Sequence, residues 1–329
     1  LPRSRSDRGL EKNNQGLTGQ AGWKLFRETH VCVSKNEITD YCTRAFHLFA
    51  PVQSCSSCPS LFAFPMRLIV LASGSSGNVL YIESGATSVL VDCGLSAKET
   101  ARRMTEAGLD PTKLSAVVIT HEHTDHMKGT RVFASTAEVP VYMSEATRAE
   151  CKFPADGEKI PWGQTIASSE PFEIGTLNFY PFTIPHDGVD TFAFTVESEG
   201  VKIGAVTDLG YITQLVAEQL RGSTLVMIES NHDRDMLKVA PYPWSVKQRI
   251  ASNVGHLSND ETARWIRHDF DGQAEYLVLA HLSRHCNHPE LARLSALEAL
   301  DYHGSLFFPR AEQRVRIAPP DRASEWFEL

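Results

Sequence analysis

The sequence predicts an α/β (α+β) fold in which two mixed β-sheets pack together and are flanked by helices. Three observations lead to this prediction. Short apolar segments typical of β-strands follow one another from residue 66 onward. Helical segments with recognisable start and stop signals lie between these strands. The chain has 329 residues, 42% of them hydrophobic, which is enough to bury one large core or two modest ones.

We expect strands where apolar runs of a few residues stand between turn signals. The predicted strands are 67–72, 78–84, 88–94, 115–121, 139–144, 176–184, 191–198, 201–208, 223–230 and 275–283. Three helices have clear boundaries, and two of them open with a capping box, a serine three positions before a glutamate. The predicted helices are 96–108, with Ser96, Glu99 and the terminal Gly108; 258–270, with Ser258 and Glu261; and 289–301, which starts at Pro289.

The composition changes at Met66. Residues 1–65 show no sustained helical or strand period and are rich in Ser, Arg, Asn and Gln. We expect this segment to be a disordered or wrongly assigned N-terminal extension, followed by one catalytic domain at 66–329. The alternative is a small zinc module formed by Cys55-x-x-Cys58 together with Cys32 and Cys42, although the latter two are spaced too widely for a usual zinc knuckle.

Charge and cysteine usage exclude several classes of protein. A formal net charge of −8 argues against a basic protein that coats nucleic acid, but not against an enzyme that meets phosphates at a metal site. Beyond residue 65 only Cys93, Cys151 and Cys286 occur, which predicts a reduced, cytoplasmic protein without disulfides. No apolar stretch is long enough to span a bilayer, and Pro65 and Arg67 interrupt the run 61–72 that resembles a signal segment. We therefore expect no membrane partner.

The stretch HEHTDH, residues 121–126, has the residue types of a metal site. His121 stands at the end of a predicted buried strand, and His123 can face the same way in an extended loop. Asp125 and His126 follow where the chain can turn toward a neighbouring point. The motif can therefore offer two imidazole nitrogens to one cation and a carboxylate with a nitrogen to a second.

Three further candidate ligands also stand at or just after the ends of predicted strands. They are His186, Asp208 and His281. A lone histidine is more often structural than a ligand, but several strand ends that carry His or Asp in one chain favour a joint metal site. The carboxylate of Asp208 could bridge two ions.

ITHEHTDH, then His186, TDLG and AHLS resemble the ordered motifs of the metallo-β-lactamase superfold. The resemblance covers 66–329 and implies an αβ/βα four-layer sandwich that holds two divalent metal ions, Zn²⁺ or Mn²⁺. It also implies the ligand roles: His121, His123 and His186 for one ion; Asp125, His126 and His281 for the other; Asp208 as the bridge; and Asp92, in VLVDCG, as the carboxylate that orients a ligand histidine. Two such ions would activate a bridging hydroxide as the nucleophile and stabilise charge on a phosphoryl or carbonyl oxygen.

Two additional stretches bear on the substrate. In ASGSSGN, the residues Ser75, Ser76 and Asn78 could bind an anion near the metals, the alternative being a flexible hairpin turn. Glu229 and His256 could act together, His256 as the acid that protonates a leaving alkoxide and Glu229 as the carboxylate that fixes its tautomer. The alternatives are a solvated carboxylate and a structural histidine. With Asp125, these two are the predicted catalytic residues.

SGSSGN, ESNHD and GHLSN resemble the nucleic-acid-processing branch of the superfold, which includes ribonuclease Z and ribonuclease J, and most of all the YycJ (WalJ) group. This resemblance implies a phosphodiesterase, most specifically a 5′-to-3′ exonuclease on DNA or RNA. The segment between Asp208 and His281 is too short for the inserted β-CASP domain of ribonuclease J. The substrate clamp which that domain provides is therefore absent.

Residues 232–250 are the best candidate for holding a polynucleotide. Tyr242 and Trp244 could stack on bases, and Arg234, Lys238, Lys247 and Arg249 supply cations. The alternative is a loop and an amphipathic helix whose aromatic side chains pack inward.

Other functions remain open at this point. A small-molecule phosphodiesterase, for example one that hydrolyses a cyclic phosphate, would use the same residues and suits the acidic charge. A thioester hydrolase gives no role to Glu229 and His256. A secreted β-lactamase is disfavoured because His126 replaces the residue usual there, and a metal-binding protein without turnover is disfavoured by the complete ligand set. The sequence leaves open whether the chain forms a homodimer.

Overall fold

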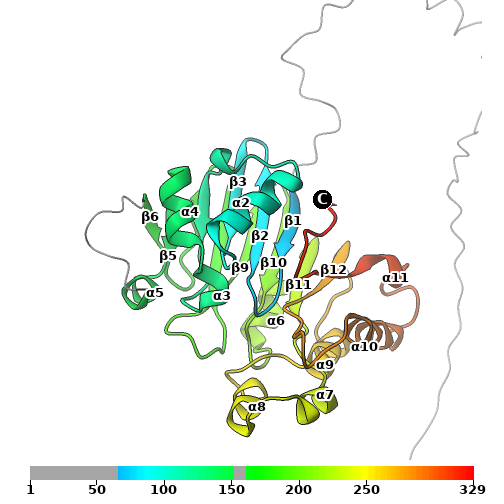
Figure 1. Cartoon of the computed structure of the whole chain (residues 1–329). Coiled ribbons are helices and arrows are strands. Elements are labelled where there is room, and N and C mark those ends of the chain that lie inside the picture. The colour runs from blue at the N-terminus through cyan, green and yellow to red at the C-terminus, as the bar shows by residue number, and fades with distance from the viewer. Residues whose placement is uncertain (1–65, 152–160) are drawn as a thin grey trace, which may run out of the picture. The chain divides into compact units, whose positions relative to one another are not determined.

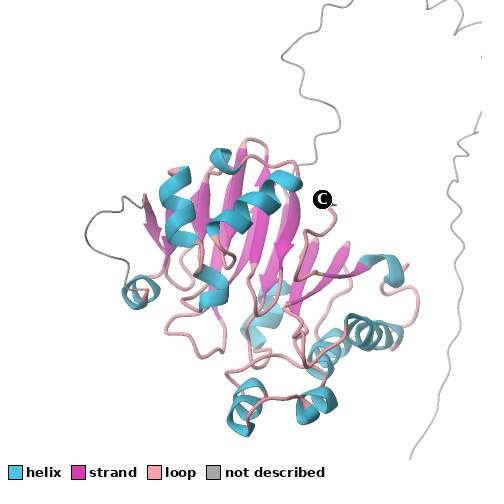
Figure 2. Ribbon diagram, viewed as in Figure 1, coloured by secondary structure: helices cyan, strands magenta, loops and turns pink. Residues whose placement is uncertain are grey.

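The computed structural model describes residues 66–151 and 161–329. The predicted N-terminal extension, and the alternative of a zinc module at Cys32, Cys42, Cys55 and Cys58, lie outside the described residues. Within the described part, two sheets of seven strands each form the centre of the fold. Figure 2 shows helices on both sides of the strands, so the predicted class of two mixed sheets flanked by helices is confirmed.

The first sheet contains the N-terminal strands and the C-terminal one. Its strands, in spatial order, are β14 (Phe327–Glu328), β1 (Arg67–Ala72), β2 (Val79–Ser84), β3 (Thr87–Val91), β4 (Ala116–Val118), β5 (Val141–Met143) and β6 (Trp162–Thr165). Pairing is antiparallel from β14 to β3 and parallel from β3 to β6.

The second sheet has the same mixed character. Its strands, in spatial order, are β13 (Val315–Ile317), β12 (Tyr276–Ala280), β11 (Leu225–Glu229), β10 (Val201–Val206), β9 (Phe192–Ser198), β8 (Leu177–Thr183) and β7 (Phe172–Ile174). Pairing is parallel from β13 to β10 and antiparallel from β10 to β7. The short strands β6, β7, β13 and β14 were not predicted, because segments of two to four residues carry too little periodic pattern.

Helices from both halves of the chain lie on the outer faces of the two sheets (Figure 1). Between strands β3 and β6 of the first sheet, the chain forms α2 (Ala97–Glu106), the 3₁₀ turn η2 (Pro111–Lys113), α3 (Thr124–Met127), α4 (Thr130–Ala137) and α5 (Glu145–Glu150). The second half of the chain contributes α6 (Gln214–Leu220), α7 (Arg234–Val239), α8 (Trp244–Ile250), α9 (Asn259–His268), α10 (Pro289–Asp301) and α11 (Ala311–Arg314). No helix within the described residues has the length and apolar character that crossing a bilayer requires.

Three apolar clusters hold the layers together. The central cluster lies between the sheets, where Phe172 stacks on Phe179 with ring centroids 5.1 Å apart and Phe194 meets both rings edge-on. A second cluster joins α6, α9 and α10 to the second sheet, and a third joins α2 and α4 to the first sheet. Removing this apolar surface from water is the main favourable term in folding, and it fixes the strand ends that carry the site.

The predicted helix starts are confirmed. The hydroxyls of Ser96 and Ser258 accept hydrogen bonds from the backbone N–H of Glu99 and Glu261, at 3.3 and 3.2 Å. Pro289 is the first residue of α10. After α2, Gly108 adopts a φ of +79°, the left-handed conformation that ends helices and that glycine adopts without strain.

A buried arginine joins α2 to the first sheet, and we predict a measurable contribution from it to stability. Arg103 donates from Nη1 to the carbonyl oxygens of Leu71 and Pro320, at 2.8 and 3.3 Å. We expect Arg103→Ala to lower the free energy of unfolding by about 2 kcal/mol, because buried acceptors would lose their partner. Urea denaturation followed by circular dichroism measures this change. Arg102→Ala is the matched control, since Arg102 forms only surface ion pairs and its loss should cost under about 1 kcal/mol. Equal losses in the two variants would contradict the prediction.

Candidate metal centre

The candidate residues follow the ends of strands from both sheets. His121 comes three residues after β4, Asp208 two residues after β10, Glu229 is the last residue of β11, and His281 follows β12 directly. Since β10, β11 and β12 are parallel neighbours, their carboxyl ends meet at one edge of the second sheet. The structure thus brings together residues that are more than 150 positions apart in the sequence.

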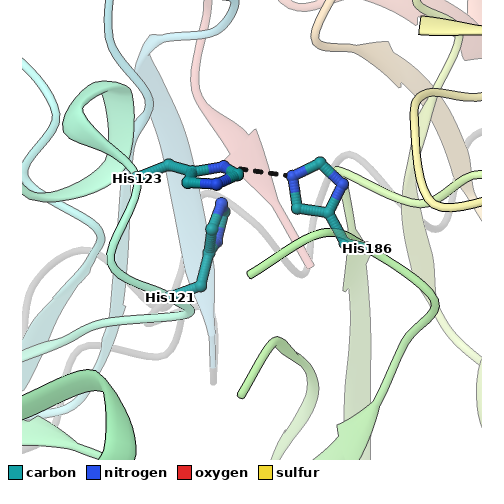
Figure 3. Close-up of side chains that lie close together, drawn as sticks. All are labelled: His121, His123 and His186. Carbon is teal, nitrogen blue, oxygen red and sulfur yellow. Dashed lines mark hydrogen bonds between the residues drawn. The ribbon is translucent and has the colours of Figure 1, made fainter. Parts of the chain in front are cut away.

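Three histidines form the first cluster (Figure 3). The ring centroids of His121, His123 and His186 lie 4.6 to 5.1 Å apart. His186 Nδ1 donates to the carbonyl oxygen of Gly255 at 3.1 Å, which leaves its Nε2 facing His123 Nδ1 at 3.2 Å. The Nε2 of buried His121 has no hydrogen-bond partner among the described residues. Three imidazole groups that converge on one point suit a cation.

The second cluster adds carboxylates. It consists of Asp125, His126, Asp208 and His281, whose candidate ligand atoms all lie within 4.8 Å of one another. Asp208 lies between the histidines, with Oδ2 3.1 Å from His126 Nε2 and Oδ1 3.2 Å from His281 Nδ1. Neither Asp208 Oδ2 nor His281 Nε2 has a hydrogen bond of acceptable geometry within the described residues. Buried polar atoms of this kind are costly unless a ligand satisfies them.

Asp92 and Thr120 contact candidate ligand histidines on the side of each ring that faces away from the clusters. Asp92 Oδ2 accepts a hydrogen bond from His126 Nδ1 at 2.7 Å, so the Nε2 lone pair of His126 faces the cluster. The hydroxyl of Thr120 lies 3.0 Å from Asp92 Oδ2 and 2.9 Å from His121 Nδ1. Thr120 was not predicted, because a threonine at a strand end gives no signal by itself.

Glu229 contacts both His256 and His281. Its Oε1 accepts hydrogen bonds from His256 Nδ1 at 2.9 Å and from His281 Nδ1 at 2.7 Å. Its Oε2 accepts from the backbone N–H of Leu209 and Leu257, at 3.0 and 3.1 Å. The predicted pair of Glu229 and His256 is therefore in contact, and the bond to His281 was not foreseen. One buried carboxylate fixes the tautomers of two histidines.

The pKa values in the site follow from burial and from the carboxylates. Burial lowers the pKa of His121 well below its usual value, so its nitrogen is free to bind a metal. Burial acts in the same direction on His281, but the carboxylate of Asp208 outweighs it and raises the pKa of His281 to about 10. Burial raises the pKa of Glu229, but His256 and His281 outweigh this effect and bring it down to about 2. Positive charge is therefore favoured at the second cluster, which fits divalent cations.

Three site residues have an unusual backbone. Asp92, Asp208 and His281 adopt φ values of 63°, 63° and 54°, in the left-handed region that residues other than glycine rarely occupy. Each such conformation costs about 1–3 kcal/mol and persists only where the surrounding structure enforces it. For His281, the backbone N–H donates to Ser73 Oγ at 2.8 Å and the carbonyl accepts from Asn231 Nδ2 at 2.8 Å. Strained backbone conformations cluster at functional sites, so their presence at three strand ends favours a functional role for this part of the protein.

The predicted substrate-binding residues do not lie together in one place in the structure. Ser75 and Ser76 are exposed in the loop after β1. Asn78 is buried, and its Nδ2 lies 3.0 Å from His126 Nε2 at the edge of the second cluster. Lys247 lines a cavity that His256 also lines. Tyr242 instead packs in a small apolar cluster with Leu237, Ala240 and Cys286 and is not among the residues that line this cavity.

The hydrogen bond between Asp92 and His126 leads us to a prediction about metal affinity. Asp92→Asn keeps a residue type that tolerates the left-handed backbone but removes the charge that orients His126. We expect metal affinity to fall about 10- to 100-fold, because losing such an orienting carboxylate weakens metal binding by this factor. Competition with a chromophoric chelator measures the affinity. Asp301→Asn, at an exposed aspartate at the end of α10, is the control. Unchanged affinity in Asp92→Asn would refute the orienting role.

Fold and site together define a class of protein. Two mixed sheets flanked by helices carry imidazole and carboxylate clusters at one edge, with three unsatisfied buried ligand atoms. Nitrogen and carboxylate donors in these numbers are those of catalytic sites for divalent metal ions. Fold and site are therefore those of a protein that binds divalent metal ions.

Comparison with known proteins identifies the family. The family described as beta-lactamase superfamily domain matches residues 87–282, and the chain belongs to it. Exodeoxyribonuclease YycJ of Bacillus anthracis is 35% identical over 241 residues, 73% of this chain and 90% of the relative. Exodeoxyribonuclease WalJ of Streptococcus pneumoniae is 32% identical over 233 residues, 70% of this chain and 87% of the relative. These identities confirm the resemblance to the YycJ (WalJ) group.

A solved structure supports the fold. The metallo-beta-lactamase fold protein YhfI from Bacillus subtilis superposes with a TM-score of 0.61 at 19% identity, covering 79% of this chain and all of the other. At this identity the likeness concerns the architecture alone. It confirms the predicted metallo-β-lactamase sandwich.

Proposed function

We propose that the protein removes nucleotides from the 5′ ends of DNA strands. The family match and the two exodeoxyribonucleases described above show that the chain is a metal-dependent phosphodiesterase of the nuclease class, with nucleic acid as substrate. The names of both relatives specify deoxyribonucleic acid and exonuclease action, which supports DNA over RNA for this chain. The single observation that carries the proposal is the hydrogen bond between His256 and Glu229 beside the clustered histidines, at 2.9 Å.

We infer that the site holds two ions, Zn²⁺ or Mn²⁺. His121, His123 and His186 would hold the first, and Asp125, His126 and His281 the second, with Asp208 between them. When bound, such ions supply a water activated for attack and neutralise charge on the phosphoryl oxygens. The separation of the ligands into two groups, each with its own convergent atoms, supports the dinuclear assignment.

The side chains of this protein would supply the proton transfers. Glu229 holds Nδ1 of His256, so Nε2 is the atom that can give a proton to the departing 3′ oxygen. His256 is partly exposed, which gives it access to a substrate, whereas Glu229 is fully buried. Asp125 is the most exposed carboxylate of the second cluster and would accept a proton from the attacking water.

A cyclic or other small phosphodiester is the second candidate substrate. Several cations of the segment 232–250 are already paired with acids: Arg234 with Asp260 and Glu261, Lys238 with Asp235, and Arg249 with Asp187. A surface with few unpaired cations attracts a polynucleotide weakly. Homodimer formation and a cytoplasmic location stay predictions from the sequence.

The substrate assay separates these alternatives. The full chain, loaded with Mn²⁺ or Zn²⁺, is incubated with end-labelled single-stranded DNA and RNA, bis(p-nitrophenyl) phosphate, a cyclic phosphate and a thioester. Release of mononucleotides from the 5′ end of DNA is the expected result. Hydrolysis of only the cyclic phosphate or the thioester would show that the exonuclease proposal is wrong.

A further inference from the structure

A cavity of about 330 Å³ adjoins His256 on the side of α7 and α8. Figure 1 shows these two helices beyond the ends of the strands, and Lys247 of α8 donates to the carbonyl oxygen of Lys238 in α7, which ties them together. Pockets for small ligands span about 300–1,000 Å³. This cavity is at the lower end of that range, so it can take one nucleotide rather than a length of strand.

Because the cavity lies beside His256, the role of His256 determines which part of a substrate the cavity would bind. In phosphoryl transfer the attacking and leaving oxygens lie roughly in line on opposite sides of phosphorus. The leaving oxygen must therefore be the one near His256, if His256 is its acid. Because the same histidine lines the cavity, the group that departs with this oxygen extends into the cavity.

The lining offers contacts for each part of a nucleotide. Trp244 is 70% exposed on the first turn of α8, so its ring face is available to stack on a base. Lys247 has no acidic partner among the described residues, unlike Arg234 and Lys238, and its ammonium can meet a phosphate. His232 is only 2% exposed, and its Nδ1 lacks a hydrogen-bond partner within the described part of the chain. A polar atom of a bound ligand would satisfy it.

We propose that this cavity receives the 5′-terminal nucleotide of the strand, with Trp244 against its base and Lys247 at its terminal phosphate. This inference rests on the proposed exonuclease function and specifies its substrate. Water forms a bond to phosphorus, the bond from phosphorus to the 3′ oxygen of the terminal nucleotide breaks, and that oxygen takes a proton from His256. The products are a nucleoside 5′-monophosphate and a strand with a new 5′-phosphate. The shortened strand can enter the same cavity, so removal proceeds one nucleotide at a time.

Two variants and three forms of one DNA strand test the assignment. The strand carries a 5′-phosphate, a 5′-hydroxyl or a bulky 5′-biotin. For wild type we expect kcat/KM to be highest for the strand with a 5′-phosphate, lower for the 5′-hydroxyl strand and lowest for the 5′-biotin strand. Trp244→Ala should lower kcat/KM for the phosphorylated strand, relative to that for bis(p-nitrophenyl) phosphate, by about tenfold, the value of one lost stacking contact. Lys247→Ala should remove most of the preference for 5′-phosphate over 5′-hydroxyl. Tyr302→Ala, at an equally exposed aromatic residue after α10, is the matched control and should change neither ratio.

Binding gives a readout independent of turnover. Isothermal titration calorimetry with thymidine 5′-monophosphate and metal-free protein should show a dissociation constant about tenfold weaker in Trp244→Ala than in wild type or in Tyr302→Ala. Unchanged binding and an unchanged ratio in Trp244→Ala would overturn the inference, as would equal cleavage of the biotin-blocked strand, while both leave the nuclease proposal standing. Absence of any DNA hydrolysis by metal-loaded wild type would overturn the proposed function and this inference together.

Discussion

Replacing Asp208 by asparagine is expected to remove at least one metal ion per chain and to lower hydrolysis of any phosphodiester by roughly a thousandfold or more. Metal ions contribute several kcal/mol to the stabilisation of a transition state, and each 1.36 kcal/mol is about tenfold in rate. Asp208 is 2% exposed, its carboxylate lies between His126 and His281, and its Oδ2 has no hydrogen-bond partner among the described residues. Among the described residues, Asp208 is the carboxylate whose ligand atom lies within 4.8 Å of those of two groups around His281, one with Asp125 and His126 and the other with Glu229 and His256. Metal content by atomic absorption and hydrolysis of bis(p-nitrophenyl) phosphate are the measurements.

Asparagine is the informative substitution at this position. Asparagine tolerates the left-handed φ of 63° and keeps the shape of the side chain, so the change removes charge rather than the backbone conformation. Asp321→Asn, at an exposed aspartate, controls for the loss of one negative charge anywhere on the protein. Full metal content with normal activity in Asp208→Asn would mean that the two clusters hold their ions without this carboxylate. The dinuclear assignment would then need another bridge.

The positions of the candidate ligands could be predicted from the sequence because their signals are local. His121, His123, Asp125 and His126 lie within six residues, and each remaining candidate stands at or just after an apolar strand. Strand ends on one edge of a sheet converge, so the pattern of strands already placed these side chains together. The pair of Glu229 and His256 was suggested instead by the chemistry of a histidine acid beside a carboxylate and by the resemblance to ribonuclease Z, and the structure shows the two in contact at 2.9 Å.

The support around these residues could not be predicted, because it comes from distant parts of the chain. Ser73 binds the backbone of His281 across 208 positions, and Thr120 reaches back to Asp92. Serine and threonine are common at strand ends, so the sequence does not indicate which of them support site residues through hydrogen bonds. Tyr242 and Trp244 illustrate the same limit: both are aromatic residues near one turn, but only packing decides that Tyr242 is half-buried in an apolar cluster and Trp244 faces solvent.

Replacing His256 by alanine is expected to slow strand hydrolysis by about 100- to 10,000-fold, the usual contribution of a positioned general acid. The loss should appear in kcat, because the proton is needed only when the 3′ oxygen departs. Bis(p-nitrophenyl) phosphate should be affected far less, since p-nitrophenolate is a stable leaving group that departs without protonation. The ratio between the two substrates therefore separates loss of the acid from general damage to the site. His268→Ala, at an exposed histidine near the end of α9, is the control.

The geometry allows His256 to be either the general acid or a metal ligand, and the metal content of the variant distinguishes these two roles. Asp208, Glu229, His256 and His281 also have ligand atoms within 4.8 Å of one another, so this group could itself hold a cation. However, Glu229 already accepts four hydrogen bonds, two from histidines and two from backbone N–H groups, which leaves it little capacity as a ligand. We therefore expect His256→Ala to keep the full metal stoichiometry. Loss of an ion in this variant, with equal slowing of both substrates, would instead make His256 a ligand.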